Sequence, residues 1–131
     1  MKDVIYDEFQ IKVDEVLIRH ANLLDILSKM GDAAAKSNRA VIKSITNCGC
    51  VQLNVAKVEI PENLSYEALK DFKSEHLQGE PCAVCREKIE EELGRLEFYI
   101  AAVCNSLDIS LYDVLLKEYK KISTLGRYSL Y

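Results

Sequence analysis

Four of the five cysteines form two close pairs, and their spacing is typical of a metal-binding site. Cys48 and Cys50 are separated by one glycine, Cys82 and Cys85 form a Cys-x-x-Cys pair, and 31 residues lie between the two pairs. A tetrahedral zinc site commonly takes its four soft ligands from two such pairs, each on a turn that directs both sulfur atoms to one position. The sequence therefore predicts that these four cysteines hold one metal ion, with zinc as the first choice.

The same thiols also fit other chemistry. An iron–sulfur cluster takes four cysteine ligands as well. Cys82 and Cys85 alone have the spacing of a redox dithiol, although no βαβ pattern surrounds them. A further interpretation is that the cysteines have no functional role and are free thiols in a reducing cell. The fifth cysteine, Cys104, falls on the late face of a helix, where we expect it to be a small buried residue.

The two histidines are weaker candidates for metal ligands. His20 falls inside an apolar stripe, which favours a position in a core or an interface. His76 precedes Cys82 by six residues and could replace a cysteine ligand. A solvent-exposed position in a linker is the preferred interpretation of His76.

The strongest helical pattern begins at the second cysteine pair and runs to about Asn105. Such a helix places Cys82 and Cys85 at its first turn, where the helix macrodipole and free N–H groups favour thiolates. Its apolar residues recur at steps of three or four, as on the core-facing side of a helix. These residues are Ile89, Leu93, Leu96, Ile100 and Val103.

Two further helices are predicted before the first cysteine pair. Residues 4–30 keep a seven-residue apolar rhythm, which predicts one long helix that serves as a homo-oligomer interface or as a bundle core. Gly31 is a natural C-terminal cap for this helix, and Asp32 is a natural N-cap for the next one. The second helix is expected from Ala33 to about Thr46.

The middle of the chain carries weaker signals. Residues 51–55 alternate between apolar and polar or small side chains, but no partner strand is evident, so a loop or an isolated extension is predicted. Ser65 can cap a short helix that carries Leu69 and Phe72. Residues 76–81 contain a glycine and a proline and are interpreted as a linker.

The last helix follows a tight connection at residues 107–110. Ser110 and Asp113 form a start that resembles a capping box, and Gly126 marks the end. The predicted fold is therefore all-α, with four main helices, one short helix and an irregular region that carries the cysteines. The length of 131 residues fits a single helical domain over residues 1–131.

Composition excludes some classes of function. The net charge is −4 and the sequence pI about 5.2, so no basic surface for nucleic acid is expected. No apolar run approaches the roughly 20 residues that span a bilayer, so no membrane partner is expected. The first ten residues, MKDVIYDEFQ, are acidic where a signal peptide has an apolar core, which predicts a cytoplasmic protein.

A dense block of carboxylates follows the second cysteine pair, and part of it opens a longer motif. The block consists of Glu87, Glu90, Glu91 and Glu92. The motif reads Glu91-Glu92-Leu93-Gly94-Arg95-Leu96, then Phe98-Tyr99, Asn105, Leu107-Asp108-Ile109, Asp113-Val114-Leu115, and the lysines Lys117, Lys120 and Lys121. Over roughly residues 90–122 it resembles the later half of the MazG-like nucleoside triphosphate pyrophosphohydrolases.

The resemblance implies an all-α bundle, dimeric or higher, in which two acidic motifs hold magnesium ions at a nucleotide phosphate site. Glu92 matches the glutamate of the second motif, and Glu91 matches the acid before it. Arg95 stands where the family has an aspartate, and an arginine does not ligate magnesium. The helix predicted from Ala33 to Thr46 contains no E-x-x-E, so the first motif is missing.

Three functions follow from these patterns. The preferred interpretation is a non-catalytic MazG-like binding or regulatory protein with a structural metal site made of the four paired cysteines. The alternative is an active pyrophosphohydrolase with a nucleotide ligand, in which Glu87, Glu90, Glu91, Glu92 and Asp108 form a rearranged magnesium site. A second alternative is a thiol-based redox or metal sensor. Without magnesium, the glutamates form a solvated face that the helix N-terminus favours.

Overall fold

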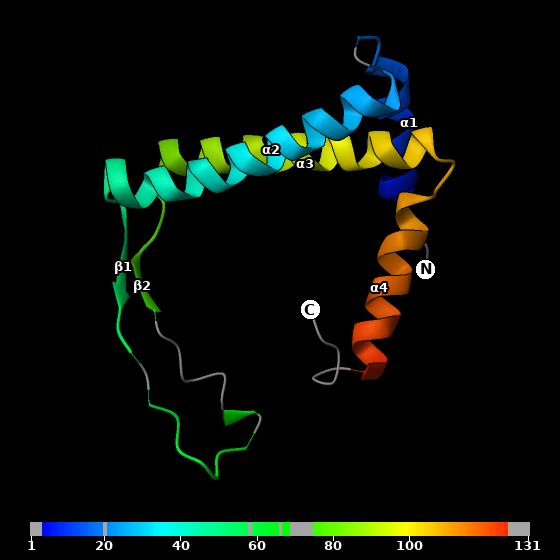
Figure 1. The fold of residues 1–131 in the computed structure, drawn as a ribbon. Helices are drawn as coiled ribbons and strands as arrows, with labels where there is room; N and C mark the ends of the chain where they lie inside the picture. The colour runs from blue at the N-terminus through cyan, green and yellow to red at the C-terminus, as the bar shows by residue number, and fades with distance from the viewer. Residues whose placement is uncertain (1–3, 20, 58, 66, 69–74, 126–131) are drawn as a thin grey trace. The chain divides into compact units, whose positions relative to one another are not determined.

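The computed structural model describes residues 4–19, 21–57, 59–65, 67–68 and 75–125 (Figure 1). The chain is mostly helical, and the described residues contain four main helices, as many as predicted: α1 (Val4–Val16), α2 (Leu23–Lys43), α3 (Ala83–Ser106) and α4 (Leu111–Leu125). A short π-helical turn, η1 (Ser44–Cys48), ends α2, and two strands, β1 (Val51–Val55) and β2 (Glu75–Gly79), precede α3.

The chain forms two compact units. The first unit comprises residues 1–36 and 92–131, and the second unit comprises residues 37–91. Helices α2 and α3 are each shared between the units, because each begins in one and ends in the other. The single domain expected over residues 1–131 stays a prediction.

The long first helix is interrupted, so the prediction of one helix over residues 4–30 is wrong. Helix α1 ends at Val16 and α2 begins at Leu23. Asn22 caps α2, because its Oδ1 accepts the Asp25 N–H at 2.9 Å and its Nδ2 donates to the Asp25 carboxylate at 3.0 Å. The seven-residue stripe that was expected to form an interface is therefore divided between two helices.

Helix α2 also continues through the predicted boundary at Gly31 and Asp32. A glycine inside a helix costs only about 1 kcal/mol relative to alanine, which the rest of a 21-residue helix offsets. Asp32 contributes an ion pair with Lys36 at 3.0 Å, one turn later, instead of a cap.

The core of the first unit is small. Its fully buried apolar cluster consists of Val13, Ile26, Ala101 and Ala102, from α1, α2 and α3. Phe9, Leu17, Phe98, Val103 and Leu111 pack around this cluster and stay partly exposed. Many large apolar side chains elsewhere on the chain are more than a third exposed, and several of them lie on α4. The first unit therefore leaves much of its apolar surface uncovered.

A glutamine from α1 fixes the turn between α3 and α4. The chain bends by 107° at this turn, where Asp108 adopts a positive φ of 54°. The Gln10 side chain donates to the Ile109 carbonyl at 2.7 Å and accepts the Leu111 N–H at 2.9 Å. The Ser110 hydroxyl accepts the Asp113 N–H at 3.2 Å, which confirms the predicted start of the last helix.

We expect Gln10→Ala to lower the free energy of unfolding of the first unit by about 1–3 kcal/mol, because a turn carbonyl and a turn N–H lose their partner together. Chemical denaturation followed by helical circular dichroism measures this loss. Glu8→Ala, an exposed change on the same helix, is the matched control and should stay within about 0.5 kcal/mol. Equal stability of the two variants would show that Gln10 does not hold the turn.

The second unit contains a strand pair that the sequence did not reveal. Strand β1 pairs antiparallel with β2, in a register that places Val51 opposite Gly79 and Leu53 opposite Leu77. The predictions of an isolated extension and of a linker at residues 76–81 are therefore wrong, and the fold is not purely α. The two strands lie 19 residues apart in sequence, and the pattern of β2, Glu-His-Leu-Gln-Gly, is too polar to indicate a strand by itself.

The predicted short helix lies mostly outside the described residues, which do not include Leu69 and Phe72. Ser65 does accept the Ala68 N–H at 3.3 Å through its hydroxyl, as a capping serine does. Among the described residues, no single helix has the length and hydropathy of a membrane span. Helices α3 and α4 pass that test only as a pair, bent at the turn between them.

Candidate metal centre

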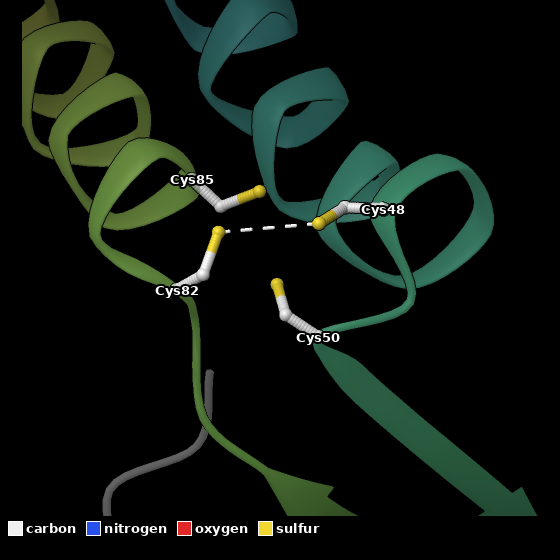
Figure 2. A group of neighbouring side chains, drawn as sticks. All are labelled: Cys48, Cys50, Cys82 and Cys85. Carbon is white, nitrogen blue, oxygen red and sulfur yellow. Dashed lines mark hydrogen bonds between the residues drawn. The ribbon is translucent and has the colours of Figure 1, made fainter.

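All four paired cysteines meet in the second unit. Their Sγ atoms lie within 4.8 Å of one another and point into one space (Figure 2). The Cys48 and Cys82 sulfur atoms are 3.9 Å apart. Four thiolates around a zinc ion with Zn–S bonds of about 2.3 Å have sulfur atoms about 3.8 Å apart. The four cysteines therefore form a group that could hold a metal ion, as the sequence predicted.

The first pair is positioned by the unusual end of α2. The π-helical turn η1 carries Cys48, and Gly49 reverses the chain in the left-handed conformation, at φ 78°. Ser44, at the start of η1, is buried, and its carbonyl accepts the Gly49 N–H at 3.0 Å and the Cys50 thiol at 3.6 Å. Single π-helical turns of this kind are frequent at functional sites, since they change the direction of side chains at a helix end.

The second pair is positioned by the start of α3. Cys82 is the N-cap residue, because α3 begins at Ala83 and the Cys82 carbonyl accepts the Arg86 N–H at 2.8 Å. Cys85 follows in the first helical turn, so both sulfur atoms lie on the same side of the helix end (Figure 2). Arg86 also pairs with Glu80 at 3.4 Å, which ties the first turn to the residues before it.

The hairpin joins the two pairs through a position that only glycine can occupy. Strand β1 leaves Cys50 and β2 leads towards Cys82 (Figure 2), and the register pairs Val51 with Gly79. Gly79 has a φ of 76°, and a Cβ on it would lie 2.6 Å from the Cys50 carbonyl oxygen. Both the backbone conformation and the close approach exclude a side chain here. The backbone at Gly79 therefore lies close to the backbone of Cys50, three residues before Cys82.

The thiols perturb one another strongly. The Cys85 backbone N–H, followed by the Cys85 thiol, lowers the pKa of Cys82 to about 7. Hydrogen bonding to Cys82, then to Cys50, raises the pKa of Cys85 to about 12, and the Cys50 thiol raises the pKa of Cys48 above its usual value. Without a cation, the cluster therefore favours a single thiolate at Cys82, and its neighbours donate to it.

In metal-free protein, we expect Cys82 to react first with iodoacetamide. A pKa of about 7 leaves about half of Cys82 as thiolate at pH 7, and only the thiolate is nucleophilic. The rate should rise as the pH passes upward through 7 and then level off, whereas Cys85 should stay unreactive up to pH 9. Peptide mapping after short exposures from pH 6 to 9 measures both. Faster labelling of Cys85 than of Cys82 would contradict the assignment.

The other thiol and the histidines lie outside this cluster. Cys104 is buried in α3 of the first unit, as predicted, and burial raises its pKa. His76 lies exposed in β2 opposite Asn54 and is not a member of the cluster. His20 is outside the described residues.

The carboxylates of the alternative magnesium site are not gathered in one place. Glu87, Glu90 and Glu91 are exposed on α3. Asp108 lies in the turn after α3, 16 residues beyond Glu92, which corresponds to more than about 20 Å of helix. Among the described residues, the only group of three or more His, Cys, Asp or Glu at metal-binding distances is the cysteine cluster.

Glu92 differs from the other three glutamates because it is buried, with 2% of its surface exposed. Arg95 donates to both of its carboxylate oxygens from the same nitrogen, at 3.1 and 3.0 Å. The sequence indicated a solvated acidic face and gave no sign that one member was buried. The i, i+3 spacing of Glu92 and Arg95 is the one signal from which their pairing could have been predicted.

In comparisons with known proteins, no family model, no curated protein and no solved structure matches the chain.

Proposed function

We propose that this protein is a non-catalytic binding or regulatory protein whose second unit is held together by a zinc ion on Cys48, Cys50, Cys82 and Cys85. The observation that carries the proposal is the convergence of four sulfur atoms within 4.8 Å. The separation of 3.9 Å between Cys48 and Cys82 matches a tetrahedral thiolate site.

The second unit has little else to stabilise it. Its buried residues among those described are Ser37, Ala40, Ser44 and Val51, which together offer little apolar surface. Small units that lack an adequate core usually depend on a metal, on disulfides or on oligomerisation. The described cysteines form no disulfide, and four of them give this unit a complete set of ligands for a metal.

The ligand set also supports a structural role over a catalytic one. Four protein thiolates complete a tetrahedral zinc site, whereas catalytic zinc keeps a position open for water or substrate. The clamp would join the end of α2 to the start of α3, and the hairpin would extend from the clamped end. The remaining glutamates serve as solvated surface in this proposal, and Glu92 is neutralised by Arg95.

The relationship to the MazG-like enzymes enters as part of the proposal. The helical scaffold and the acidic α3 agree with it in outline, and the pairing of Glu92 with Arg95 supports a scaffold without magnesium chemistry. Free thiols agree with a reducing compartment such as the cytoplasm. The proposal predicts no magnesium-dependent release of pyrophosphate from any nucleoside triphosphate.

Elemental analysis with an absorption spectrum tests the proposal, on protein purified without oxygen or chelator. The expected result is about one zinc per chain and no visible absorption. Iron with visible absorption would overturn the choice of zinc in favour of an iron–sulfur cluster. Protein without any metal that keeps the second unit folded would overturn the clamp itself.

A further inference from the structure

The four sulfur atoms of the candidate metal centre differ in their access to solvent. Cys48 is exposed, whereas Cys50, Cys82 and Cys85 are half-buried. Cys48 ends the π-helical turn η1, and the next residue, Gly49, has no side chain that could cover it. A Cβ on Gly49 would meet no other part of the chain within 4 Å, so the turn beside Cys48 is open. A small polar molecule can therefore reach the Cys48 sulfur directly.

The accessible sulfur also lies against a sulfur of the other cysteine pair. The Cys48 and Cys82 Sγ atoms are 3.9 Å apart (Figure 2). A disulfide has its sulfur atoms about 2.05 Å apart, so these two atoms must approach by about 2 Å to form one. Cys48 is the last residue of η1 and Cys82 directly precedes α3, so neither lies inside a long helix that would resist a small adjustment. The two pairs are therefore placed to form a disulfide with each other.

We propose that the metal centre is a peroxide-sensitive switch, in which oxidation joins Cys48 to Cys82 through a disulfide and releases the metal. This inference rests on the proposed zinc clamp, because it concerns the regulation of the same site. When zinc is bound, its cysteine ligands are all thiolates, so access to solvent decides which of them reacts. Cys48 is therefore the sulfur that peroxide oxidises, and Cys82 is the sulfur that resolves the product.

The reaction is a two-electron oxidation with hydrogen peroxide as the oxidant. The Cys48 thiolate attacks one peroxide oxygen, the O–O bond breaks, and Cys48 becomes a sulfenic acid while the leaving hydroxide is protonated to water. The Cys82 thiolate then attacks the Cys48 sulfur, the S–O bond breaks, and the disulfide forms with release of a second water. Two of the four ligands are consumed. The other two, Cys50 and Cys85, take up protons from water when the metal leaves.

The disulfide joins the same two elements that the metal joins. It links the end of η1 to the residue before α3, 34 residues later in the sequence, and the hairpin of β1 and β2 lies within this loop. A covalent link between the ends of a loop restricts its open conformations. Oxidation is therefore expected to release the metal while the second unit stays closed, whereas reduced protein stripped of metal lacks both links.

Titration of the full chain with hydrogen peroxide tests the switch, on protein purified without oxygen and with its zinc content measured first. One equivalent of peroxide should release about one zinc per chain to a chromophoric indicator and remove two of the five thiols. Dithiothreitol with added zinc should restore both. Cys104→Ala is the matched control, because it removes the one cysteine outside the cluster and should respond as the wild type does.

Peptide mapping of the oxidised protein decides which sulfur atoms are joined. Trypsin places the first cysteine pair in residues 44–57 and the second pair in residues 74–86. These two peptides should be linked, and their fragment spectra should place the bond between Cys48 and Cys82. A disulfide inside either peptide, or one that involves Cys104, would overturn the inference.

Amide hydrogen exchange separates the switch from simple oxidative damage. Residues 44–55 and 75–85 should exchange more slowly in the oxidised protein than in reduced protein stripped by a chelator. Equal exchange in the two forms would show that the disulfide does not replace the clamp. Zinc-loaded protein that keeps its metal and thiols in peroxide would contradict the switch alone. Protein purified without zinc would contradict the clamp and the release of metal, and its peptide map after peroxide would still decide whether Cys48 pairs with Cys82.

Discussion

Under the zinc proposal, Cys82→Ser is expected to abolish metal binding and to open the second unit while the first unit stays folded. Serine cannot replace a thiolate as a soft ligand. Loss of one of four ligands should reduce zinc affinity by more than about 100-fold, because mutation of residues that only orient the ligands already reduces it by about 10–100-fold. Among its described residues, the second unit then keeps the hairpin and a few small buried residues. The first unit keeps its cluster of Val13, Ile26, Ala101 and Ala102.

Zinc content and amide hydrogen exchange together measure this result. Exchange should increase by orders of magnitude in residues 44–55 and 75–85, whereas the end of α3 should stay protected. Cys104→Ala is the matched control, because it removes the one cysteine outside the cluster, and it should retain about one zinc per chain. Unchanged exchange in the hairpin of Cys82→Ser would mean that the second unit does not depend on a metal.

Gly79→Ala is expected to damage the metal centre although residue 79 is not a ligand. The positive φ costs an alanine about 1–2 kcal/mol, and the new Cβ would lie 2.6 Å from the Cys50 carbonyl oxygen, so the backbone must move. We expect that movement to separate Cys50 from Cys82, because Cys50 directly precedes Val51 and Cys82 follows Gly79 by three residues, and Val51 and Gly79 are paired in the hairpin. We expect zinc affinity to fall by about 10–100-fold, as for other residues that orient ligands.

Competition with a chromophoric zinc chelator measures the affinity, and Gly31→Ala provides the contrast. Gly31 lies within α2 with no atom within 4 Å of an added Cβ, so alanine should stabilise the protein by about 0.5–1 kcal/mol and leave zinc affinity unchanged. If the two variants bound zinc equally well, the close approach at Gly79 would not control the cysteine geometry.

The cysteine cluster was predictable because its signal is local. Each pair lies within four residues, and each adjoins a helix end that the sequence also marks, with Gly49 after one helix and Pro81 before the next. The chemistry of four soft ligands then requires the pairs to meet. The four helices were predictable for the same reason, since apolar periodicity within about 10–20 residues reports directly on a helix face.

The boundaries at residues 17–22 and 31 were not predictable from periodicity. The apolar rhythm of residues 4–30 continues across the break, and only the cap at Asn22 shows where α2 begins. Gly31 was interpreted as a helix end, because a glycine costs a helix about 1 kcal/mol relative to alanine. That cost ends a helix only where nothing else stabilises it. In α2 the other residues of the helix offset the cost, so the helix continues through Gly31.

What the sequence by itself determined is the helical character of the chain and the membership of the cysteine group, because both depend on residues close together along the chain. Tertiary structure alone decided the β1–β2 pairing, the close approach of Gly79 to Cys50, the hydrogen bonds of Gln10 to a turn about 100 residues away, and the burial of Glu92. Each of these depends on which distant segments meet. Their energy comes from partners that no local pattern of apolar and polar residues specifies.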